Sequence, residues 1–273
     1  MFTFKYTLVM QFALHQLGYA IRHVMLAHSN GHGVHSPLAF DVCNALKATK
    51  SDAELQCQQL KALRLKILRD SQILKDAGLG AGSRVFKSEY RPVKKIARWG
   101  ISTHHKARIL FQLIRYFNPH HVLELGTSLG LTTLYMAMAQ FPRDVNTVDG
   151  NEVYIDFAQR LQKQYHPNLN ITYYHAAFQT FLNTNNTDFD FIFIDGAHDY
   201  QSTIALYEHF NKQQRSNQIL VFDDIYWSPS MTKAWHFITQ SASQHLILDA
   251  FILGIVIKNN NLRSGYHYRI NIK

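Results

Sequence analysis

The chain has 273 residues, 47% hydrophobic and 17% charged, a globular composition that excludes a largely disordered protein. The formal net charge is +9, and residues 47–115 carry the excess, with 16 Lys and Arg against 5 Asp and Glu. Two cysteines are too few for a disulfide framework. We therefore expect Cys43 and Cys57 to be reduced thiols in a cytoplasmic protein.

The N-terminus, residues 1–23, is rich in apolar residues, but polar side chains interrupt it. A membrane span needs about 18 or more nearly uninterrupted apolar residues. A signal peptide needs a basic start and a small-residue cleavage site. Neither pattern is present, so we expect no membrane span here. A helix that packs on the domain or on a second subunit is the better interpretation, and such helices would offer a contact for a homodimer.

Apolar residues at helical spacing predict three further helices, over residues 35–49, 55–80 and 105–117. In the first, Ser36 is typical of an N-cap and Pro37 of the first helical position. The second is expected to stop at Gly78 and Gly80, which are helix-ending residues.

The segment 78–100 combines glycines with six basic residues. No strand precedes it, so it is not a dinucleotide-binding fingerprint. It could form a mobile basic lid over a ligand cleft, or a solvated surface. The basic region as a whole could attract nucleic acid, anionic lipid or an acidic small substrate.

From residue 121 onward, short apolar runs alternate with helical patterns. Strands are predicted over residues 121–126, 145–150, 171–176, 189–196 and 218–224, then a hairpin over 245–251 and 254–259, then an edge strand over 266–272. Strands that alternate with helices pair in parallel, and helices cover both faces of their sheet. The sequence therefore predicts an α/β fold with a doubly wound, mostly parallel sheet.

The stretch VLELGTSLG, residues 122–130, fits two templates. As G-x-S-x-G it is a hydrolase nucleophile elbow with Ser128 as the attacking group. Such an elbow follows several earlier strands, whereas helices precede this one. A cofactor loop instead follows the first strand, opens a helix, and is matched by an acidic residue at the end of the next strand. Asp149 lies there, 23 residues after Gly126.

The motif order resembles the class I S-adenosyl-L-methionine (SAM)-dependent methyltransferases. It runs Glu124-x-Gly126-x-Ser128-x-Gly130, Asp149, HAAF, FIFIDGAHDY and ILVFDDIYW, and the resemblance spans residues 104–257. Within the superfamily the chain looks closest to the metal-dependent small-molecule O-methyltransferases, such as the catechol and caffeoyl-coenzyme-A types. The resemblance implies a Rossmann-like seven-stranded sheet with an antiparallel C-terminal hairpin. It also implies a SAM-binding domain over residues 104–273, after a helical extension or lid over 1–103.

The resemblance also implies roles for individual residues. The loop from Gly126 through Thr127 and Ser128 to Gly130 would hold the methionine end of SAM, and Glu124 would bind its amino group or order the loop. Asp149 would bind the ribose hydroxyls. Ala177 and Phe178 would border the adenine, and Asp195 would complete the cofactor site.

Three carboxylates follow two of the predicted strands. Asp195 ends the fourth strand, and Asp223 and Asp224 end the fifth. Carboxylates at one sheet edge repel one another, and a hard divalent cation would relieve this repulsion, with oxygen ligands favouring Mg²⁺ or Ca²⁺ over Zn²⁺. In the metal-dependent O-methyltransferases the corresponding positions hold the metal. We therefore expect these three residues to bind Mg²⁺.

Two features depart from that family. It usually has Asp-Asn after the fifth strand, where this chain has Asp223-Asp224, and the catechol type has a Lys base where this chain has His198. Histidine is a plausible general base near neutral pH, so His198 and Asp195 are the candidate catalytic residues. The alternative is that Asp195 orders its loop, that Asp223 and Asp224 cap the next helix, and that His198 merely lies near the cleft. Asp199 could replace any one of these four.

Other residues allow two readings each. His28, His32 and His35 could bind a metal or be surface histidines on a turn. Tyr226 and Trp227 could form an aromatic substrate wall or belong to the core.

The predicted activity is methyl transfer from SAM to a hydroxyl of a small-molecule acceptor, assisted by a metal. Three alternatives remain. They are an RNA-modifying methyltransferase that holds nucleic acid with the basic region, a cofactor-binding module without catalysis, and a hydrolase with Ser128.

Overall fold

The computed structural model describes residues 2–28, 33–48, 51–75, 89–139, 144–213, 215, 217–259 and 265–272. The chain forms two compact units. We call Ala48–Gly196 the central unit and Met1–Lys47 with Ala197–Lys273 the terminal unit. The predicted division into a helical extension or lid over residues 1–103 and a SAM-binding domain over 104–273 assigns a function to each part. It stays a prediction. Much of the basic segment, including Gly78, Gly80, Gly82, Arg84 and Lys87, lies outside the described residues.

The central unit contains four parallel strands in the order β6-β3-β4-β5. They are β3 (His121–Leu125), β4 (Asp144–Asp149), β5 (Ile171–His175) and β6 (Phe191–Ile194). All four residues of β6 and four of the five in β3 are buried, whereas β5 at the edge is half-exposed. Strands buried on both faces read as continuous apolar runs, which is why the sequence indicated them clearly.

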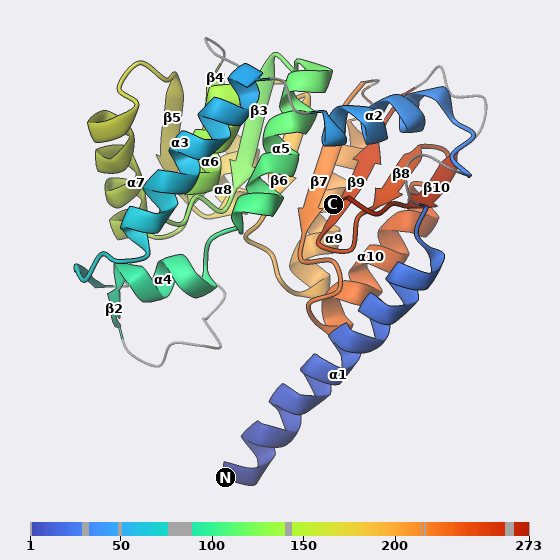
Figure 1. Ribbon diagram of the computed structural model, residues 1–273, viewed down its shortest axis with the longest axis horizontal. Helices are drawn as coiled ribbons and strands as arrows, with labels where there is room; N and C mark the ends of the chain where they lie inside the picture. Colours follow the sequence, from blue (N-terminus) through green and yellow to red (C-terminus); the bar gives the residue numbers. More distant parts are fainter. Residues whose placement is uncertain are drawn as a thin grey trace. The chain divides into compact units, whose positions relative to one another are not determined.

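The helices of the central unit are α3 (Ser51–Ile67), α4 (Val93–Trp99), α5 (His104–Phe117), α6 (Leu131–Ala139), α7 (Glu152–Tyr165) and α8 (Phe178–Thr184). Helices α3, α5 and α6 contact one another and lie on one side of the strands (Figure 1). Their shared core includes Leu60 and Leu63 of α3, Phe111 of α5 and Leu134 of α6.

The prediction of one helix over residues 55–80 is wrong at its C-terminal end. Helix α3 stops at Ile67, and the Asp70 side chain accepts a hydrogen bond of 2.8 Å from the Gln72 amide, which turns the chain. Strand β1 (Ile73–Lys75) follows and pairs antiparallel with β2 (Tyr90–Pro92). Leu74 is buried, as its spacing suggested, but it reaches the core from a strand.

The terminal unit holds strands β7 (Ile219–Asp223), β8 (Leu246–Asp249), β9 (Leu253–Ile257) and β10 (Tyr266–Arg269). Strand β9 pairs antiparallel with both β7 and β8, and the edge strand β10 pairs parallel with β8. The fold-class prediction is confirmed, because the sheet is mostly parallel, its C-terminal strands are antiparallel, and helices precede it. The hairpin turn falls at residues 250–252, slightly before the predicted Leu253-Gly254.

The helices of the terminal unit are α1 (Phe2–Leu26), α2 (Pro37–Lys47), α9 (Tyr200–Lys212) and α10 (Pro229–Ser241). The Ser36 hydroxyl accepts from the Ala39 amide at 3.4 Å, in agreement with its predicted capping role. The N-terminal end of α1 extends away from the other elements of this unit (Figure 1). In the part of the chain that the structure describes, no helix is both long and apolar enough to cross a bilayer.

Candidate active site

The loop between β3 and α6 has an unusual backbone. Gly126 and Gly130 have φ angles of +115° and +75°, and Ser128 has a φ of +47° although it carries a side chain. Positive φ is unfavourable for most residues but accessible to glycine. The loop therefore uses glycine at both ends of its bend.

Close packing also requires glycine at these two positions. A Cβ on Gly126 would lie 2.9 Å from the carbonyl carbon of Asp195, and a Cβ on Gly130 would lie 2.5 Å from the Cβ of Ala158. Gly126 thus passes directly over the backbone that follows β6, and Gly130 lets α6 begin against α7. The sequence predicted a tight strand-to-helix turn here, and the structure has one.

Asp149, at the end of β4, holds this loop. Its Oδ2 accepts a hydrogen bond of 2.9 Å from the amide of Ser128, and its Oδ1 accepts one of 2.9 Å from the amide of Asn151, the N-cap of α7. Each carboxylate oxygen has two acceptor sites. The Asp149 carboxylate can therefore fix the loop and still accept hydrogen bonds from a ligand.

Glu124 is fully buried in a network of hydroxyl groups. Its Oε2 accepts hydrogen bonds from the hydroxyls of Thr133 and Thr147, the latter at 2.6 Å, and the Thr147 hydroxyl lies 2.6 Å from that of Thr127. Its Oε1 has no hydrogen-bond partner among the described residues. Burial raises the pKa of Glu124 to about 8, so the carboxyl can switch its charge when a cation approaches.

The Ser128 side chain does not have the surroundings of a nucleophile. Its hydroxyl donates a hydrogen bond of 3.1 Å to the carbonyl oxygen of Gly100. A nucleophilic serine needs a base that accepts its proton, and a backbone carbonyl cannot take that role. This contact gives the hydrolase alternative no support.

Phe178 meets the loop at Gly196. A Cβ on Gly196 would lie 2.2 Å from the Phe178 ring. The amide nitrogen of Gly196 lies 3.0 Å from the position that a Cβ on Gly126 would take. Ala177 precedes α8 and is exposed. The central unit therefore brings together the predicted cofactor residues on β3, β4 and α8, together with the residues that follow β6.

The predicted metal ligands belong to different units. Asp195 follows β6 in the central unit, and its amide donates to the Leu125 carbonyl at 2.9 Å. Asp223 and Asp224 belong to the terminal unit; Asp223 ends β7 and is buried, and Asp224 has a φ of +51°. Among the residues that the structure describes, no cluster of three or more His, Cys, Asp or Glu side chains could hold a metal ion. The metal set stays a prediction.

The alternative roles of the acidic residues can be compared with the helix caps. Helix α10 is capped by Ser228, whose hydroxyl accepts from the Met231 amide at 3.1 Å, so Asp223 and Asp224 do not cap it. Asp199 does cap α9, through the Ser202 amide at 3.0 Å. His198 lies beside Trp227, with ring centroids 5.7 Å apart. Both rings are half-buried, and in the sequence His198 comes shortly after β6 and Trp227 shortly after β7. The role of His198 as a base stays a prediction.

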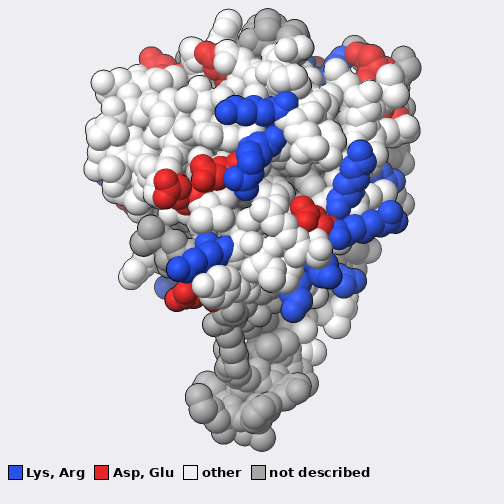
Figure 2. Space-filling model, turned by 90° about the vertical axis from the view of Figure 1, so that its left-hand side faces the viewer, with Lys and Arg blue, Asp and Glu red and all other residues white. Residues whose placement is uncertain are grey.

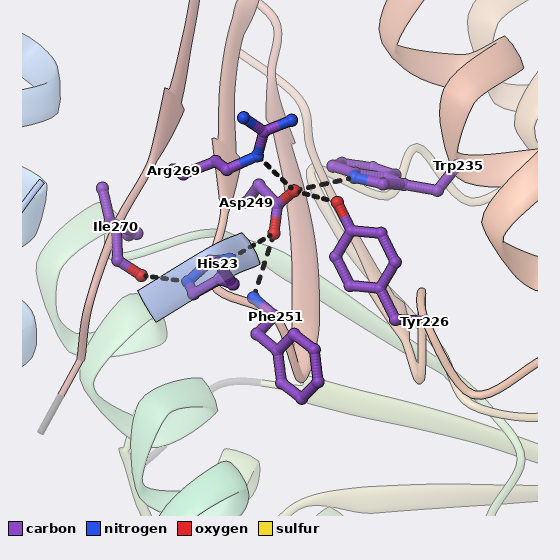
Figure 3. A network of polar contacts seen from close by, with 7 residues as sticks. All are labelled: His23, Tyr226, Trp235, Asp249, Phe251, Arg269 and Ile270. Carbon is purple, nitrogen blue, oxygen red and sulfur yellow. Dashed lines mark hydrogen bonds and ion pairs between the residues drawn. The ribbon is translucent and has the colours of Figure 1, made fainter. Parts of the chain in front are cut away.

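Tyr226 belongs to a buried network around Asp249, which the sequence did not reveal (Figure 3). Asp249 is completely buried, and its Oδ2 accepts from the Tyr226 hydroxyl and from Trp235 Nε1 at 3.4 Å. Burial, followed by the Asp249 carboxylate, raises the pKa of Tyr226, which keeps the phenol protonated as a donor. Tyr226 is therefore a core residue and not a substrate wall.

Other donors complete the network around Asp249 (Figure 3). The amide of Phe251 donates to Oδ1 at 3.0 Å, His23 Nδ1 lies 3.5 Å from the same oxygen, and Arg269 Nε lies 3.9 Å from Oδ2. A buried carboxylate is costly unless such donors surround it. The one sequence signal was an isolated acidic residue at the end of an apolar run, in LILD.

Helix α1 contacts the turn after β7. Tyr19 stacks on Tyr226 with ring centroids 4.7 Å apart, and Gln16 donates a 3.2 Å hydrogen bond to the Trp227 carbonyl. Within the terminal unit, α1 thus packs against the segment that follows Asp223 and Asp224. The prediction that this helix packs on the domain agrees with these contacts.

The N-terminal histidines have ordinary structural contacts where they are described. The ring of His28 lies 5.9 Å from that of Tyr268, and the amide of His35 donates to the Tyr268 hydroxyl at 3.2 Å. His32 lies outside the described residues. Cys43 and Cys57 are free and buried, and burial raises the pKa of Cys57 to about 11.

Comparisons with known proteins agree with the fold. Residues 123–225 match the family model described as a methyltransferase domain. The fold is that of the class I methyltransferases. No curated protein matches the chain. The resemblance to the class I SAM-dependent methyltransferases is confirmed, and metal dependence stays a prediction. The matched segment, residues 123–225, contains every predicted cofactor and metal residue.

Solved structures of methyltransferases share this fold at low identity. The SAH-bound methyltransferase PaMTH1 of Podospora anserina is 16% identical, with a TM-score of 0.52 over 59% of this chain and 80% of that chain. The O-methyltransferase TomG of Streptomyces achromogenes, in complex with SAM, is 14% identical, with a TM-score of 0.50 over 59% and 82%. A methyltransferase of Geobacter sulfurreducens is 16% identical, with a TM-score of 0.50 over 61% and 86%.

Proposed function

We propose that this protein transfers the methyl group of SAM to a hydroxyl of a small-molecule acceptor. The observation that carries the proposal is the bond between the Asp149 carboxylate and the Ser128 amide. It presents a glycine loop, backbone amides and a carboxylate at one place. That combination suits an adenosyl cofactor with a ribose and an amino-acid tail. TomG, a structural neighbour, is an O-methyltransferase.

The residues of the central unit have complementary tasks. The Asp149 carboxylate would accept hydrogen bonds from the ribose hydroxyls, and the Phe178 ring would border the adenine. Glu124 has a buried oxygen without a partner among the described residues, and the amino group of the cofactor would convert its carboxyl to the charged form. Bound SAM supplies an electrophilic methyl group, so the protein has only to position the acceptor oxygen and remove its proton.

The acceptor side uses the predicted carboxylates and His198. Asp195, Asp223 and Asp224 offer oxygen atoms, the ligand type that Mg²⁺ prefers, although the described residues do not form a cluster that would hold a metal ion. The ion would lower the pKa of a bound hydroxyl. His198 would take the proton, because histidine is the side chain that most often acts as a general base.

The test is methyl transfer from labelled SAM to a panel of phenols, catechols and sugars, with Mg²⁺ and with EDTA. We expect transfer to at least one hydroxylated acceptor, reduced by EDTA and abolished in Asp195→Ala. Transfer that EDTA leaves unchanged would remove the metal from the proposal. No transfer to any acceptor, with SAM bound, would favour the non-catalytic module.

A cytoplasmic location and a homodimer are further parts of the proposal. Two buried free cysteines fit a reducing compartment. Helix α1 exposes apolar side chains at a spacing that suits pairing with a second helix, namely Leu14, Leu17, Ile21, Val24 and Met25. Sedimentation of the wild type against Leu17→Glu would test the dimer, which we expect the substitution to dissociate.

A further inference from the structure

A long groove runs along α3 and α7 of the central unit, apart from the residues of the cofactor loop. Its largest part has a volume of about 510 Å³ and lies between the C-terminal part of α3 and the C-terminal part of α7. A second hollow of about 410 Å³ shares Leu63, Lys66 and Tyr165 with it, and a third of about 340 Å³ shares Tyr165 and His166 with the second. The three hollows therefore adjoin one another.

The groove is elongated. Its lining on α3 extends from Gln56 to Ile67, which at 1.5 Å per residue is about 17 Å. Binding sites for single small molecules are concave and enclose most of their ligand. A groove of this length suits an extended chain better than one compact molecule.

The charge of the groove is positive. Lys66, Arg69 and Arg160 line the largest hollow, where Asp70 is the one acidic residue among the described lining residues. All three basic side chains are exposed, and none forms an ion pair with a residue that the structure describes. Figure 2 views the side of the central unit that carries α7, where Lys and Arg side chains recur across the face with acidic ones between them.

The groove also has an apolar floor and an aromatic ring at its middle. Leu63, Ile67, Phe157 and Leu161 line the floor and are buried. Tyr165 is 36% exposed and lines all three hollows, and Lys66 Nζ lies over its ring, 5.2 Å from the centroid. Proteins that bind single-stranded nucleic acids combine aromatic side chains with basic ones, because the bases stack on the rings while the phosphates contact the cations.

We propose that this groove binds single-stranded nucleic acid. Lys66, Arg69 and Arg160 contact phosphates, and a base stacks on Tyr165. An acidic peptide would use the cations but would leave the exposed ring without a planar partner, so nucleic acid fits the lining better. The proposal concerns binding only and does not make nucleic acid the methyl acceptor. It is independent of the proposed function, because the groove shares no lining residue with the cofactor loop.

The test measures fluorescence anisotropy of labelled twelve-nucleotide oligo-U and oligo-dT with the full-length protein at several salt concentrations. We expect binding that weakens with salt, with a log–log slope of about −2 for three phosphate contacts. The triple variant Lys66→Glu, Arg69→Glu, Arg160→Glu should weaken binding at least tenfold and flatten that slope. Tyr165→Ala should weaken it about tenfold.

The matched control is Arg22→Glu, Lys212→Glu, Lys233→Glu, which makes the same charge change at exposed positions of the terminal unit. It should weaken binding much less than the groove variant. Titration with S-adenosylhomocysteine (SAH) should give the same affinity for wild type and groove variant, so failure here is distinct from failure of the cofactor site. The proposal is overturned if the wild type binds neither oligonucleotide at low salt, if both triple variants lose affinity equally, or if polyglutamate or anionic vesicles bind as tightly as oligo-U. Preference for oligo-U over oligo-dT would identify RNA as the ligand.

Discussion

The carboxylate of Asp149 accepts a hydrogen bond of 2.9 Å from the backbone amide of Ser128, 21 residues earlier in the sequence. The bond fixes a residue with positive φ at the centre of the glycine loop. The loop is thus shaped by the protein itself before any cofactor binds, and preorganisation of this kind lowers the entropic cost of binding.

Replacing Asp149 with Asn should weaken cofactor binding. In Asn an NH2 group replaces one of the two oxygens that accept from Ser128 and Asn151, so a donor would face one of these backbone amides. The Asn side chain also lacks the charge that favours ribose hydroxyls. We expect the affinity for SAH to fall at least tenfold by calorimetry. Asp156→Asn, on the exposed side of α7, is the control and should retain the wild-type affinity. Equal affinities for the two variants would contradict the role given to Asp149.

The glycines of the loop should be sensitive to a single methyl group. Gly130→Ala places a Cβ 2.5 Å from that of Ala158 at positive φ. We expect a loss of about 2 kcal/mol in the free energy of unfolding, measured in urea. Gly18→Ala is the matched control, because Gly18 lies in α1 with nothing near its Cβ position. It should stabilise the protein by about 0.5–1 kcal/mol. A stable Gly130→Ala variant would show that the loop can shift.

Local patterns accounted for most of the fold. The buried parallel strands were visible as apolar runs such as FIFI, and Gly126 and Gly130 marked the turn that follows β3. The early end of α3 was not visible, because β1 is stabilised by pairing with β2, which is 15 residues further along the chain. Such pairing leaves no local signal in the sequence.

The site was predictable to a similar degree. Motif spacing placed Glu124 and Asp149 correctly at strand ends, but it could not show that Asp149 bonds to Ser128. The Asp249 network joins side chains from α1, α10, β10 and the turn after β7 with the backbone amide of Phe251, so no short motif encodes it. For that reason the sequence alone leaves open whether Tyr226 lines a substrate site or belongs to the core. In the structure its hydroxyl donates a hydrogen bond to Asp249.

Glu124 should make stability depend on pH. Its folded pKa is about 8 and its ordinary value is 4.5. Between these values the unfolded chain releases a proton that the folded chain keeps, so the folded state loses stability as pH rises, by up to about 1.4 kcal/mol per pH unit. Glu124→Gln removes this dependence. The difference in unfolding free energy between variant and wild type should therefore move in favour of the variant from pH 5.5 to 7.5. A constant difference would mean that Glu124 is ionised in the folded protein.

Removing the Tyr226 hydroxyl should destabilise the terminal unit. Tyr226→Phe takes one donor from the fully buried Asp249, and loss of a hydrogen bond to a charged group costs about 1.5–3 kcal/mol. Tyr200→Phe is the control in the same unit, because the Tyr200 hydroxyl makes no hydrogen bond with a described residue. The midpoint temperature of thermal unfolding should be lower in Tyr226→Phe than in the wild type and unchanged in Tyr200→Phe. The SAH affinity should stay unchanged in both, since the cofactor residues lie in the central unit.

Ser128→Gly should leave cofactor binding intact. The substitution keeps the amide that Asp149 holds and relieves the positive φ, while it removes only the hydroxyl bond to Gly100. We expect SAH affinity within threefold of wild type. A loss of more than about tenfold would show that the hydroxyl itself contacts the cofactor.

The most direct test of the central claim is a crystal structure of the protein with SAH. The account predicts electron density for the nucleoside against residues 126–130, with both ribose hydroxyls within hydrogen-bond distance of the Asp149 carboxylate and the adenine beside Phe178. Crystals soaked at saturating SAH that show the loop empty, or the nucleoside bound at another place, would contradict it.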